Sequence, residues 1–268
     1  MSRWFTKCDV YFGYIRGMEI NVENLKPYEG DCREKRAQVA DMFDNIAPGY
    51  DFMNRAMTLG VDKLWRRKAV KMLRAWLGRG TGTVEALDVA AGTADLSLLL
   101  ARMIARTKVV GVDLSEGMLR LGREKIEKAG LSERITLTQA DCLKLPFGDE
   151  SFDCVTSAFG VRNFQNLLAG YKEMYRVMKP GGTLCVVEMS SPKSAVVKLF
   201  YNFYTRHIIP AAGKLVSKDV RAYSYLPESI AAVAQREAMT DLISKAGFTE
   251  ATYRSLTFGV CTIYMARK

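Results

Sequence analysis

The chain has 268 residues, 49% of them hydrophobic, and carries a formal net charge of +10 at pH 7. This length suits one α/β domain with an elaboration, and the hydrophobic fraction excludes wholesale disorder. No uninterrupted apolar run approaches the roughly 20 residues that a membrane-spanning helix needs, so we expect a soluble or peripheral protein.

Positive charge is concentrated in two stretches. Eight lysines and arginines between Arg55 and Arg79 stand against one acid, Asp62, and six between Ser190 and Tyr225 stand against Asp219. Such a field attracts anionic lipid headgroups or nucleic acid. A solvated basic face without any partner is the alternative interpretation.

Residue types that hold zinc are few. The six cysteines form no CxxC pair, and the chain has a single histidine, His207. We therefore predict that no metal is bound. Unpaired cysteines fit the reducing cytoplasm, where we expect the protein to act.

The amino-terminal part begins with residues 1–35, which lack periodicity and are predicted to form a flexible extension. Helices are expected over residues 36–57, with a break at Pro48-Gly49, and over residues 62–77, where glycines end the helix. Together they form a predicted helical cap over residues 36–80.

From residue 84 onward, strands alternate with helices. The expected strands span residues 84–90, 108–113, 134–139, 153–159 and 183–189, and the helices residues 95–106, 115–128 and 166–178. This alternation predicts a parallel, doubly wound sheet. A helical insertion, predicted as a lid over residues 190–227, then interrupts it.

The chain ends with a helix expected over residues 228–246 and two strands, 250–256 and 260–266, whose short link makes them antiparallel. The predicted fold class is therefore α/β, a Rossmann-like, doubly wound, seven-stranded sheet with an antiparallel last strand. The N-terminal helices and the insertion after the fifth strand complete one domain, residues 36–268.

The strongest local pattern is LDVAAGTADLS, residues 87–97, in which Gly92 follows a strand and opens a helix. A glycine there lets the backbone approach a ligand, and the helix N-terminus favours negative charge. Ala91 and Ala94 stand where a dinucleotide site would have glycines, which disfavours a pyrophosphate grip. Turns of this kind also occur for packing reasons alone.

Polar residues follow the next three strands. Asp113 ends the second strand, about 20 residues beyond the glycine turn, where a carboxylate accepts both ribose hydroxyls of an adenosine. Asp141 and Cys142 follow the third strand, where the carboxylate suits an adenine amino group. Ser157 lies near the carboxyl end of the fourth strand, where open α/β sheets bind ligands.

In this order, and at successive strand ends, these four patterns resemble the class I methyltransferases that use S-adenosylmethionine (SAM). A closer resemblance covers residues 35–267 and is to the family that C-methylates demethylmenaquinol and the ubiquinone precursor. It is carried by MFDNIAPGYDFMNRAMTLGVDKLW (Met42–Trp65), FGVRN (Phe159–Asn163) and YSYLPESI (Tyr223–Ile230).

The resemblance implies that SAM contacts six residues: Gly92, Thr93, Asp113, Asp141, Cys142 and Ser157. The chain departs from the family pattern where Ala91 and Ala94 replace glycines, a change that alanine tolerates if φ is negative there. It also has Asp62 where many members have histidine, which argues against a required histidine base. At Asp141, many members have asparagine.

The implied reaction transfers a methyl group from SAM to a ring carbon of demethylmenaquinol, giving menaquinol in the last step of menaquinone biosynthesis. Only the reduced ring is a carbon nucleophile, because a hydroxyl that shares its proton moves charge onto the adjacent carbon. We expect Arg162 to stabilise this charge, Asn163 to orient a hydroxyl or water, and Tyr50 to close the pocket. An arginine that only anchors a helix end is the alternative for Arg162. A benzoquinol precursor of ubiquinone, or another small lipid, is the alternative acceptor.

Residues 196–216 mix aromatic and basic side chains, as in helices that lie at a membrane interface or cover an isoprenoid tail. Ordinary packing of an inserted helix pair explains the same composition. We expect the chain to contact anionic lipid at the inner face of the cytoplasmic membrane. We expect no nucleic-acid partner, because the aromatic residues lie in apolar stretches rather than on a stacking platform. The sequence leaves open whether the chain forms a homodimer.

Overall fold

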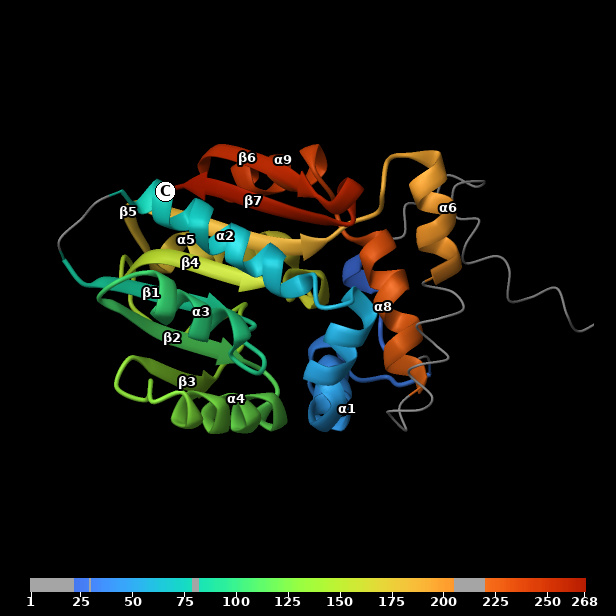
Figure 1. Ribbon diagram of the computed structural model, residues 1–268, viewed down its shortest axis with the longest axis horizontal. Helices are drawn as coiled ribbons and strands as arrows, with labels where there is room; N and C mark the ends of the chain where they lie inside the picture. Colours follow the sequence, from blue (N-terminus) through green and yellow to red (C-terminus); the bar gives the residue numbers. More distant parts are fainter. Residues whose placement is uncertain (1–21, 29, 79–81, 205–219) are drawn as a thin grey trace, which may run out of the picture.

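The computed structural model describes residues 22–28, 30–78, 82–204 and 220–268. Within these residues, seven strands form one sheet in the order β3-β2-β1-β4-β5-β7-β6 (Figure 1). The strands are β1 (Val84–Val89), β2 (Thr107–Asp113), β3 (Ile135–Gln139), β4 (Phe152–Ala158), β5 (Met178–Met189), β6 (Thr249–Leu256) and β7 (Cys261–Arg267). Strands β1 to β5 are parallel, and β7 runs antiparallel to both β5 and β6. The predicted α/β class with an antiparallel last strand is confirmed.

Helices cover both faces of the sheet and one of its edges. They are α1 (Lys35–Thr58), α2 (Asp62–Leu77), α3 (Asp95–Met103), α4 (Glu116–Lys128), α5 (Leu167–Val177), α6 (Ala195–Phe203), α8 (Val220–Ala232) and α9 (Glu237–Lys245). Three short 3-10 turns are η2 (Val22–Asn24), η3 (Val161–Asn163) and η5 (Thr257–Gly259). Helices α2, α3 and α4 pack on one face, and α5 and α9 pack on the other.

The strands are buried on both sides because successive side chains point to opposite faces. On β4, Cys154 packs with the α2 side and Val155 with the α5 side. On β5, Cys185 likewise packs with the α2 side and Val186 with the α5 side. This two-sided burial explains why the central strands read as continuous apolar runs rather than alternating ones.

The start of two helices follows from local capping. Ser115 Oγ accepts the N–H of Met118 at 3.1 Å, as its position before α4 predicts. Asn166 Oδ1 accepts the N–H of Ala169 at 2.7 Å at the start of α5. Each cap satisfies one of the amides that a helix N-terminus leaves without a partner.

Two predictions about where helices are continuous were wrong. Pro48 does not interrupt α1, which is one helix because buried Met42 and Met53 anchor it on both sides of an exposed proline. Conversely, the helix predicted over residues 228–246 is divided into α8 and α9. The division lies at Arg236, which has φ 54° and donates its backbone N–H to the Tyr264 hydroxyl at 2.8 Å. Tertiary contacts decided both cases.

Part of the segment predicted to be a flexible extension packs against the domain. Val22 is 1% exposed, and its carbonyl accepts a hydrogen bond from Lys35 Nζ at 2.6 Å. Glu23 Oε1 accepts the N–H of Leu167 at 2.8 Å. Most of the predicted extension, residues 1–21, lies outside the described residues. Residues 205–219 of the insertion predicted over residues 190–227 lie outside them as well.

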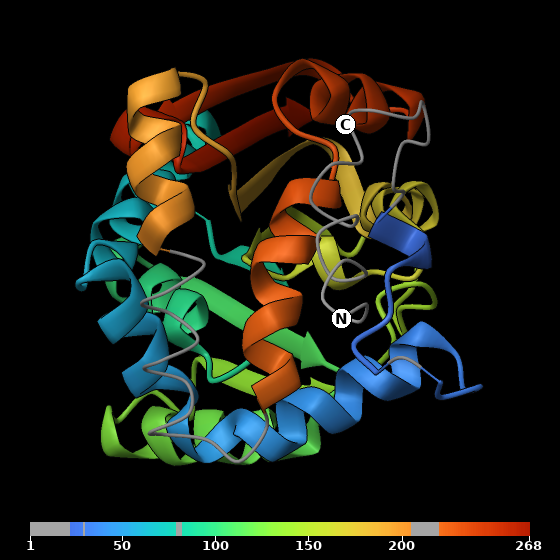
Figure 2. The ribbon, with the colours of Figure 1, turned by 90° about the vertical axis from the view of Figure 1, so that its right-hand side faces the viewer.

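Helices α1 and α8 lie beyond the carboxyl ends of the parallel strands, and α6 lies further along the same side (Figures 1 and 2). Figure 2 looks onto this end of the sheet, which α1 and α8 cross. In the part of the chain that the structure describes, no helix is both long and apolar enough to cross a bilayer.

Candidate active site

Three neighbouring cavities lie between the carboxyl ends of the strands and the helices above them. The first has about 720 Å³ of empty space, the second about 450 Å³ and the third about 320 Å³. Tyr50 of α1 lines all three. Phe43 and Asn163 are shared by the first and second, and Gly92 by the first and third. The cavities therefore form one composite site around Tyr50.

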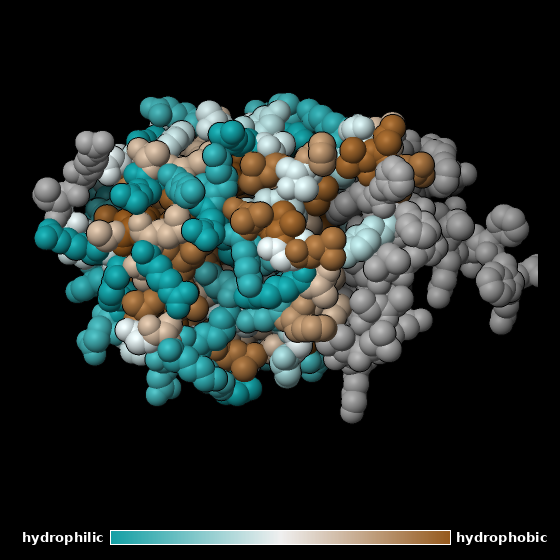
Figure 3. Space-filling model, in the orientation of Figure 1, coloured by the Kyte–Doolittle hydropathy of each residue, from teal (hydrophilic) through white to brown (hydrophobic). Residues whose placement is uncertain are grey.

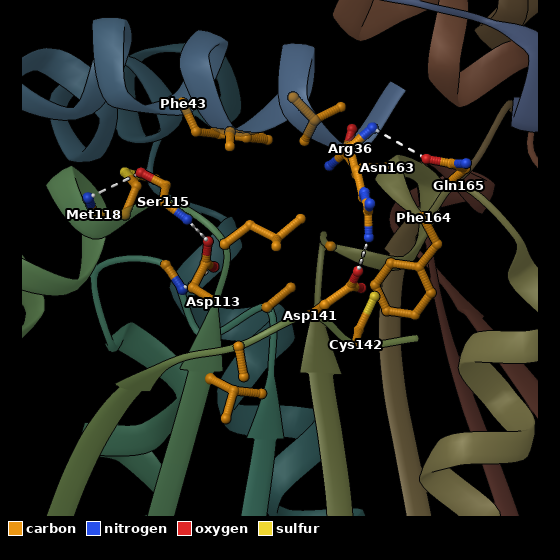
Figure 4. Close-up of a pocket in the computed structure, with 18 of the residues that line it drawn as sticks. Arg36, Phe43, Asp113, Ser115, Met118, Asp141, Cys142, Asn163, Phe164 and Gln165 are labelled. Atoms are coloured by element: carbon orange, nitrogen blue, oxygen red, sulfur yellow. Dashed lines mark hydrogen bonds and ion pairs between the residues drawn. The ribbon is translucent and has the colours of Figure 1, made fainter. Parts of the chain in front are cut away.

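Asp113, at the end of β2, points into the first cavity (Figure 4). Its Oδ2 accepts the N–H of Gly92 at 2.8 Å, and its Oδ1 accepts the N–H of Ser115 at 3.0 Å. Burial raises the pKa of Asp113, and these amide donors oppose the rise. Each carboxylate oxygen keeps a lone pair, so the group can still accept the two hydroxyls of a ribose.

Asp141 and Cys142, just beyond β3, lie on the other side of the same cavity (Figure 4). Asp141 Oδ1 accepts the N–H of Leu143 at 2.9 Å, and its Oδ2 pairs with Arg36 Nη1 of α1 at 3.1 Å. The remaining lining is mostly apolar and comes from several elements: Val39, Phe43, Val112, Met118, Leu143 and Phe164. An apolar slot with a carboxylate at its edge suits a flat heterocycle that carries an amino group.

The turn between β1 and α3 holds unusual backbone angles. Gly92 has φ 55°, which glycine adopts without strain, but Ala90 has φ 58° and Ala94 has φ 64°. The condition under which alanine was expected to be tolerated, a negative φ, is therefore not met at Ala94. A left-handed conformation costs an alanine roughly 1–2 kcal/mol. The surrounding contacts of the turn hold it in this strained form.

The third cavity is lined by charged groups of both signs, among them Arg66 and Asp88. Arg66, 6% exposed, pairs with Asp62 in the next turn of α2, and its guanidinium lies 4.9 Å from the centre of the Phe159 ring. Asp88 is 1% exposed, and burial raises its pKa to about 6. A cavity with a cation and a carboxylate suits a zwitterion such as the amino-acid end of SAM.

Sequence reasoning missed Arg66 and Asp88. Arg66 was counted in the basic stretch from Arg55 to Arg79, although its side chain faces inward. The sequence did hold a sign that Arg66 is buried. Arg66 lies four residues after Asp62, and both lie on the helix face that carries the buried Trp65 and Leu73. A cation at such a position needs a buried partner.

The second cavity lies between α1, η3 and α8. Its lining is largely apolar and rich in methionine: Met42, Phe43, Ile46, Met53, Met57, Ala222 and Leu226. Arg162 and Asn163 of η3 and Tyr225 of α8 add polar groups. Arg162 Nη1 pairs with the buried carboxylate of Glu188 at 2.7 Å.

Buried polar atoms without partners gather at this second cavity. Within the described residues, four buried side-chain atoms lack a hydrogen-bond partner, and three belong to residues that line it: Arg162 Nε, Asn163 Oδ1 and Tyr225 Oη. An unsatisfied buried polar group costs roughly 1–3 kcal/mol. A bound molecule with polar atoms on an apolar body would satisfy all three groups.

Most of the predicted site residues come together in the structure. The first cavity is lined by Gly92, Asp113, Asp141 and Cys142. The second is lined by the three residues predicted to act on the methyl acceptor: Tyr50, Arg162 and Asn163. Thr93 lines the third cavity instead, where Asp51 Oδ1 accepts its hydroxyl at 2.6 Å.

Ser157 differs from the other predicted site residues, because it lines none of these three cavities. It is fully buried, and its Oγ is the fourth unpartnered atom. A Cβ added to Gly160 would lie 3.2 Å from this Oγ, which places Ser157 beneath the floor of the first cavity.

The sheet order and the acidic residues at successive strand ends define the class I SAM-dependent methyltransferase fold. A SAM-dependent methyltransferase from Thermotoga maritima, described as a possible histamine N-methyltransferase, superposes with a TM-score of 0.60. It shares 18% sequence identity, and the match covers 85% of this chain and 99% of that one, a likeness that shows the fold alone.

The sequence matches the ubiE/COQ5 methyltransferase family over residues 31–268, and the chain belongs to this family. A demethylmenaquinone methyltransferase of Bacteroides fragilis is 46% identical over 251 residues, which are 94% of this chain and all of the relative. The enzyme of that name from Porphyromonas gingivalis is 49% identical over 247 residues, or 92% of this chain and 98% of the relative. The predicted resemblance is confirmed, and the protein is a SAM-dependent methyltransferase.

Proposed function

We propose that this enzyme transfers a methyl group from SAM to a ring carbon of demethylmenaquinol and so completes menaquinol in the last step of its biosynthesis. The observation that carries the proposal is the second cavity, which is apolar and bordered by unpartnered buried polar atoms. It adjoins the nucleotide-sized first cavity at Tyr50 and Asn163. The names of the two bacterial relatives support a naphthoquinol acceptor.

The first and third cavities fit the two ends of the methyl donor. Asp113 accepts the ribose hydroxyls, and Asp141 with Cys142 holds the adenine edge. Gly92 gives the backbone room beside the sugar, while Thr93 and Arg66 face the amino-acid end. SAM supplies a methyl group on a sulfonium, which is already a strong electrophile.

The second cavity fits a reduced quinone ring. Arg162 Nε carries a hydrogen that donates to a ring oxygen, and Asn163 Oδ1 accepts from a ring hydroxyl. A quinol offers such a hydroxyl and an oxidised quinone does not, so the polar groups favour the reduced ring. Tyr50, between the cavities, limits how the ring approaches the methyl group. In-line positioning of this kind supplies roughly 7–11 kcal/mol of the barrier.

Arg162 also has a structural role, so its part in catalysis must be tested with a conservative substitution. Arg162→Ala would leave the buried Glu188 carboxylate unpaired, which typically costs about 3–5 kcal/mol. Arg162→Lys keeps the charge beside Glu188. It removes the planar guanidinium to which the unpartnered Nε belongs. The lysine variant therefore separates catalysis from folding.

The substrate assignment is tested with purified enzyme, SAM and demethylmenaquinol that carries one isoprene unit. We expect the reduced acceptor to gain one methyl group by mass analysis and the oxidised acceptor to gain none. The corresponding demethylated benzoquinol is run in parallel. Transfer to the benzoquinol alone would replace the proposed acceptor, and transfer to neither quinol would overturn the proposal.

We also propose that the enzyme works against anionic lipid at the inner face of the cytoplasmic membrane. The outward side of α2 carries a stripe of exposed cations one turn apart: Lys63, Arg67, Lys71 and Arg74. Exposed apolar side chains lie at its start and on α6: Leu59, Leu64, Val196 and Leu199. On the face in Figure 3, apolar residues stand among hydrophilic ones along α2 and gather again over α6. This mixture suits a lipid surface.

A further inference from the structure

Tyr225 of α8 is a buried tyrosine whose ring packs with Met42 and Ile46 of α1. It is 2% exposed, and its hydroxyl has no hydrogen-bond partner. Two other buried tyrosines on the described chain do have one. The Tyr171 hydroxyl donates to Met239 Sδ at 3.3 Å, and the Tyr264 oxygen accepts the N–H of Arg236 at 2.8 Å.

The surroundings of Tyr225 connect it to the acceptor cavity. It lines this cavity together with Arg162 and Asn163, which belong to η3, an element that contacts α8. Ser229, one turn further along α8, also lines it, but its hydroxyl donates to the Leu226 carbonyl at 2.9 Å. Of the two α8 residues with hydroxyl groups that line the cavity, Tyr225 is the one whose hydroxyl has no hydrogen-bond partner.

The charge state of the hydroxyl follows from its burial. Burial raises the pKa of Tyr225 well above its usual value, and the nearby Arg162 opposes the rise only in part. The hydroxyl therefore stays protonated at neutral pH. A protonated phenol can donate one hydrogen bond and accept another, whereas it is a poor base.

We propose that Tyr225 is a catalytic residue, whose hydroxyl donates a hydrogen bond to a ring oxygen of the quinol from the α8 side of the cavity. This inference rests on the function proposed above and adds a contact from a second wall. The hydrogen bond stabilises the negative charge that the ring oxygen carries once its proton has passed to water. The ring carbon then takes the methyl group from the sulfonium, which leaves as the thioether, and the hydrogen displaced from that carbon is lost as a proton. Arg162 and Asn163 bind the ring from η3, so the acceptor is contacted by both η3 and α8.

The proposal predicts an unusual combination of effects for Tyr225→Phe. The hydroxyl has no partner in the free enzyme, so its removal relieves an unsatisfied buried group rather than breaking a bond. The thermal midpoint should therefore rise by about 2 °C. Turnover should fall on the order of 100-fold, as when one hydrogen-bond donor to an oxyanion is lost.

The experiment compares wild type, Tyr225→Phe and the matched control Tyr171→Phe, which removes a buried hydroxyl far from the cavity. Three quantities are measured: turnover of the reduced one-isoprene acceptor, the SAM dissociation constant by calorimetry, and the thermal midpoint. We expect Tyr225→Phe to keep SAM affinity, gain stability and lose turnover. Tyr171→Phe should keep turnover.

Three other results would overturn the role proposed for Tyr225. A Tyr225→Phe enzyme with wild-type turnover overturns the catalytic assignment and leaves the proposed function standing. A fall in its thermal midpoint shows that the hydroxyl has a structural partner, and also overturns it. A wild type that methylates no quinol overturns the proposed function, and this inference with it.

Discussion

Asp88, on β1, shows how one side chain makes the stability of the fold depend on pH. It accepts hydrogen bonds from Ser97 Oγ at 2.6 Å and Thr156 Oγ1 at 3.0 Å. Burial nevertheless raises its pKa from 3.8 to about 6. Because the folded state keeps this proton to a higher pH than the unfolded chain, the contribution of Asp88 to stability falls as pH rises through that interval.

Asp88→Asn removes this titration while it keeps the size of the side chain. Between about pH 4 and pH 6, the wild type should lose up to about 3 kcal/mol of unfolding free energy relative to the variant. Urea denaturation of both proteins at several pH values measures the difference, and the variant corrects for every other titrating group. Parallel pH profiles would show that Asp88 does not titrate in this range.

At the scale of elements, α1 is fastened across the composite site. Three of its side chains bind loops at the strand ends: Arg36 binds Asp141, Asp44 binds Ser115, and Asp51 binds Thr93. Each partner belongs to a loop that lines the first or the third cavity. The helix and these loops therefore position one another, and Figure 4 shows α1 crossing above the first cavity.

The first residue of α1 also holds η3 in place. Lys35 is 2% exposed, and its Nζ donates to the carbonyls of Val22 at 2.6 Å and Phe164 at 3.2 Å. Burial lowers its pKa to about 8. This one ammonium joins η2, α1 and the turn that carries Arg162 and Asn163.

Lys35→Met should loosen this turn without touching the cavities. It leaves buried carbonyls without a donor, which costs about 1–3 kcal/mol. We expect faster hydrogen exchange at the amides of Asn163 and Phe164. The control is Lys26→Met, because Lys26 is a partly exposed lysine that donates to the carbonyl of Arg33. Equal exchange in the two variants would contradict the assigned role.

At the scale of the whole molecule, the charge map differs from the one that a count along the chain suggests. Arg66 and Arg55 lie in the basic stretch, but they pair with Asp62 and Asp95. Four other cations of α2, Lys63, Arg67, Lys71 and Arg74, form the exposed stripe. The lipid surface proposed for this stripe depends on its position rather than on net charge.

The membrane proposal is tested with two triple variants of equal charge. Lys63→Glu, Arg67→Glu and Lys71→Glu change the stripe, while Lys108→Glu, Lys128→Glu and Lys245→Glu change exposed lysines elsewhere. Each lysine or arginine near an anionic surface contributes about 1 kcal/mol, so the stripe variant should bind anionic vesicles about 100-fold more weakly at low salt. Equal weakening in both variants would indicate net charge alone. No binding by the wild type would refute the proposal.

Features with a local cause could be predicted from the sequence. The two-sided burial of Val84–Val89 and the cap at Ser115 each depend on a few neighbouring residues. The placement of Asp113 and Asp141 also followed, because the carboxyl ends of parallel strands meet at one edge of a sheet. Four of the six residues predicted to contact SAM, Gly92, Asp113, Asp141 and Cys142, line the first cavity.

The amino-acid order by itself determined the alternation of strands and helices, the family and the carboxylates at the carboxyl ends of β2 and β3. Only the tertiary structure decided that Pro48 stays within a helix, that Arg66 turns inward, that Ser157 lies beneath the site and that the Tyr225 hydroxyl is left free. These four outcomes share a physical reason. Burial and hydrogen-bond satisfaction depend on which distant segments meet, and local periodicity holds no information about such partners.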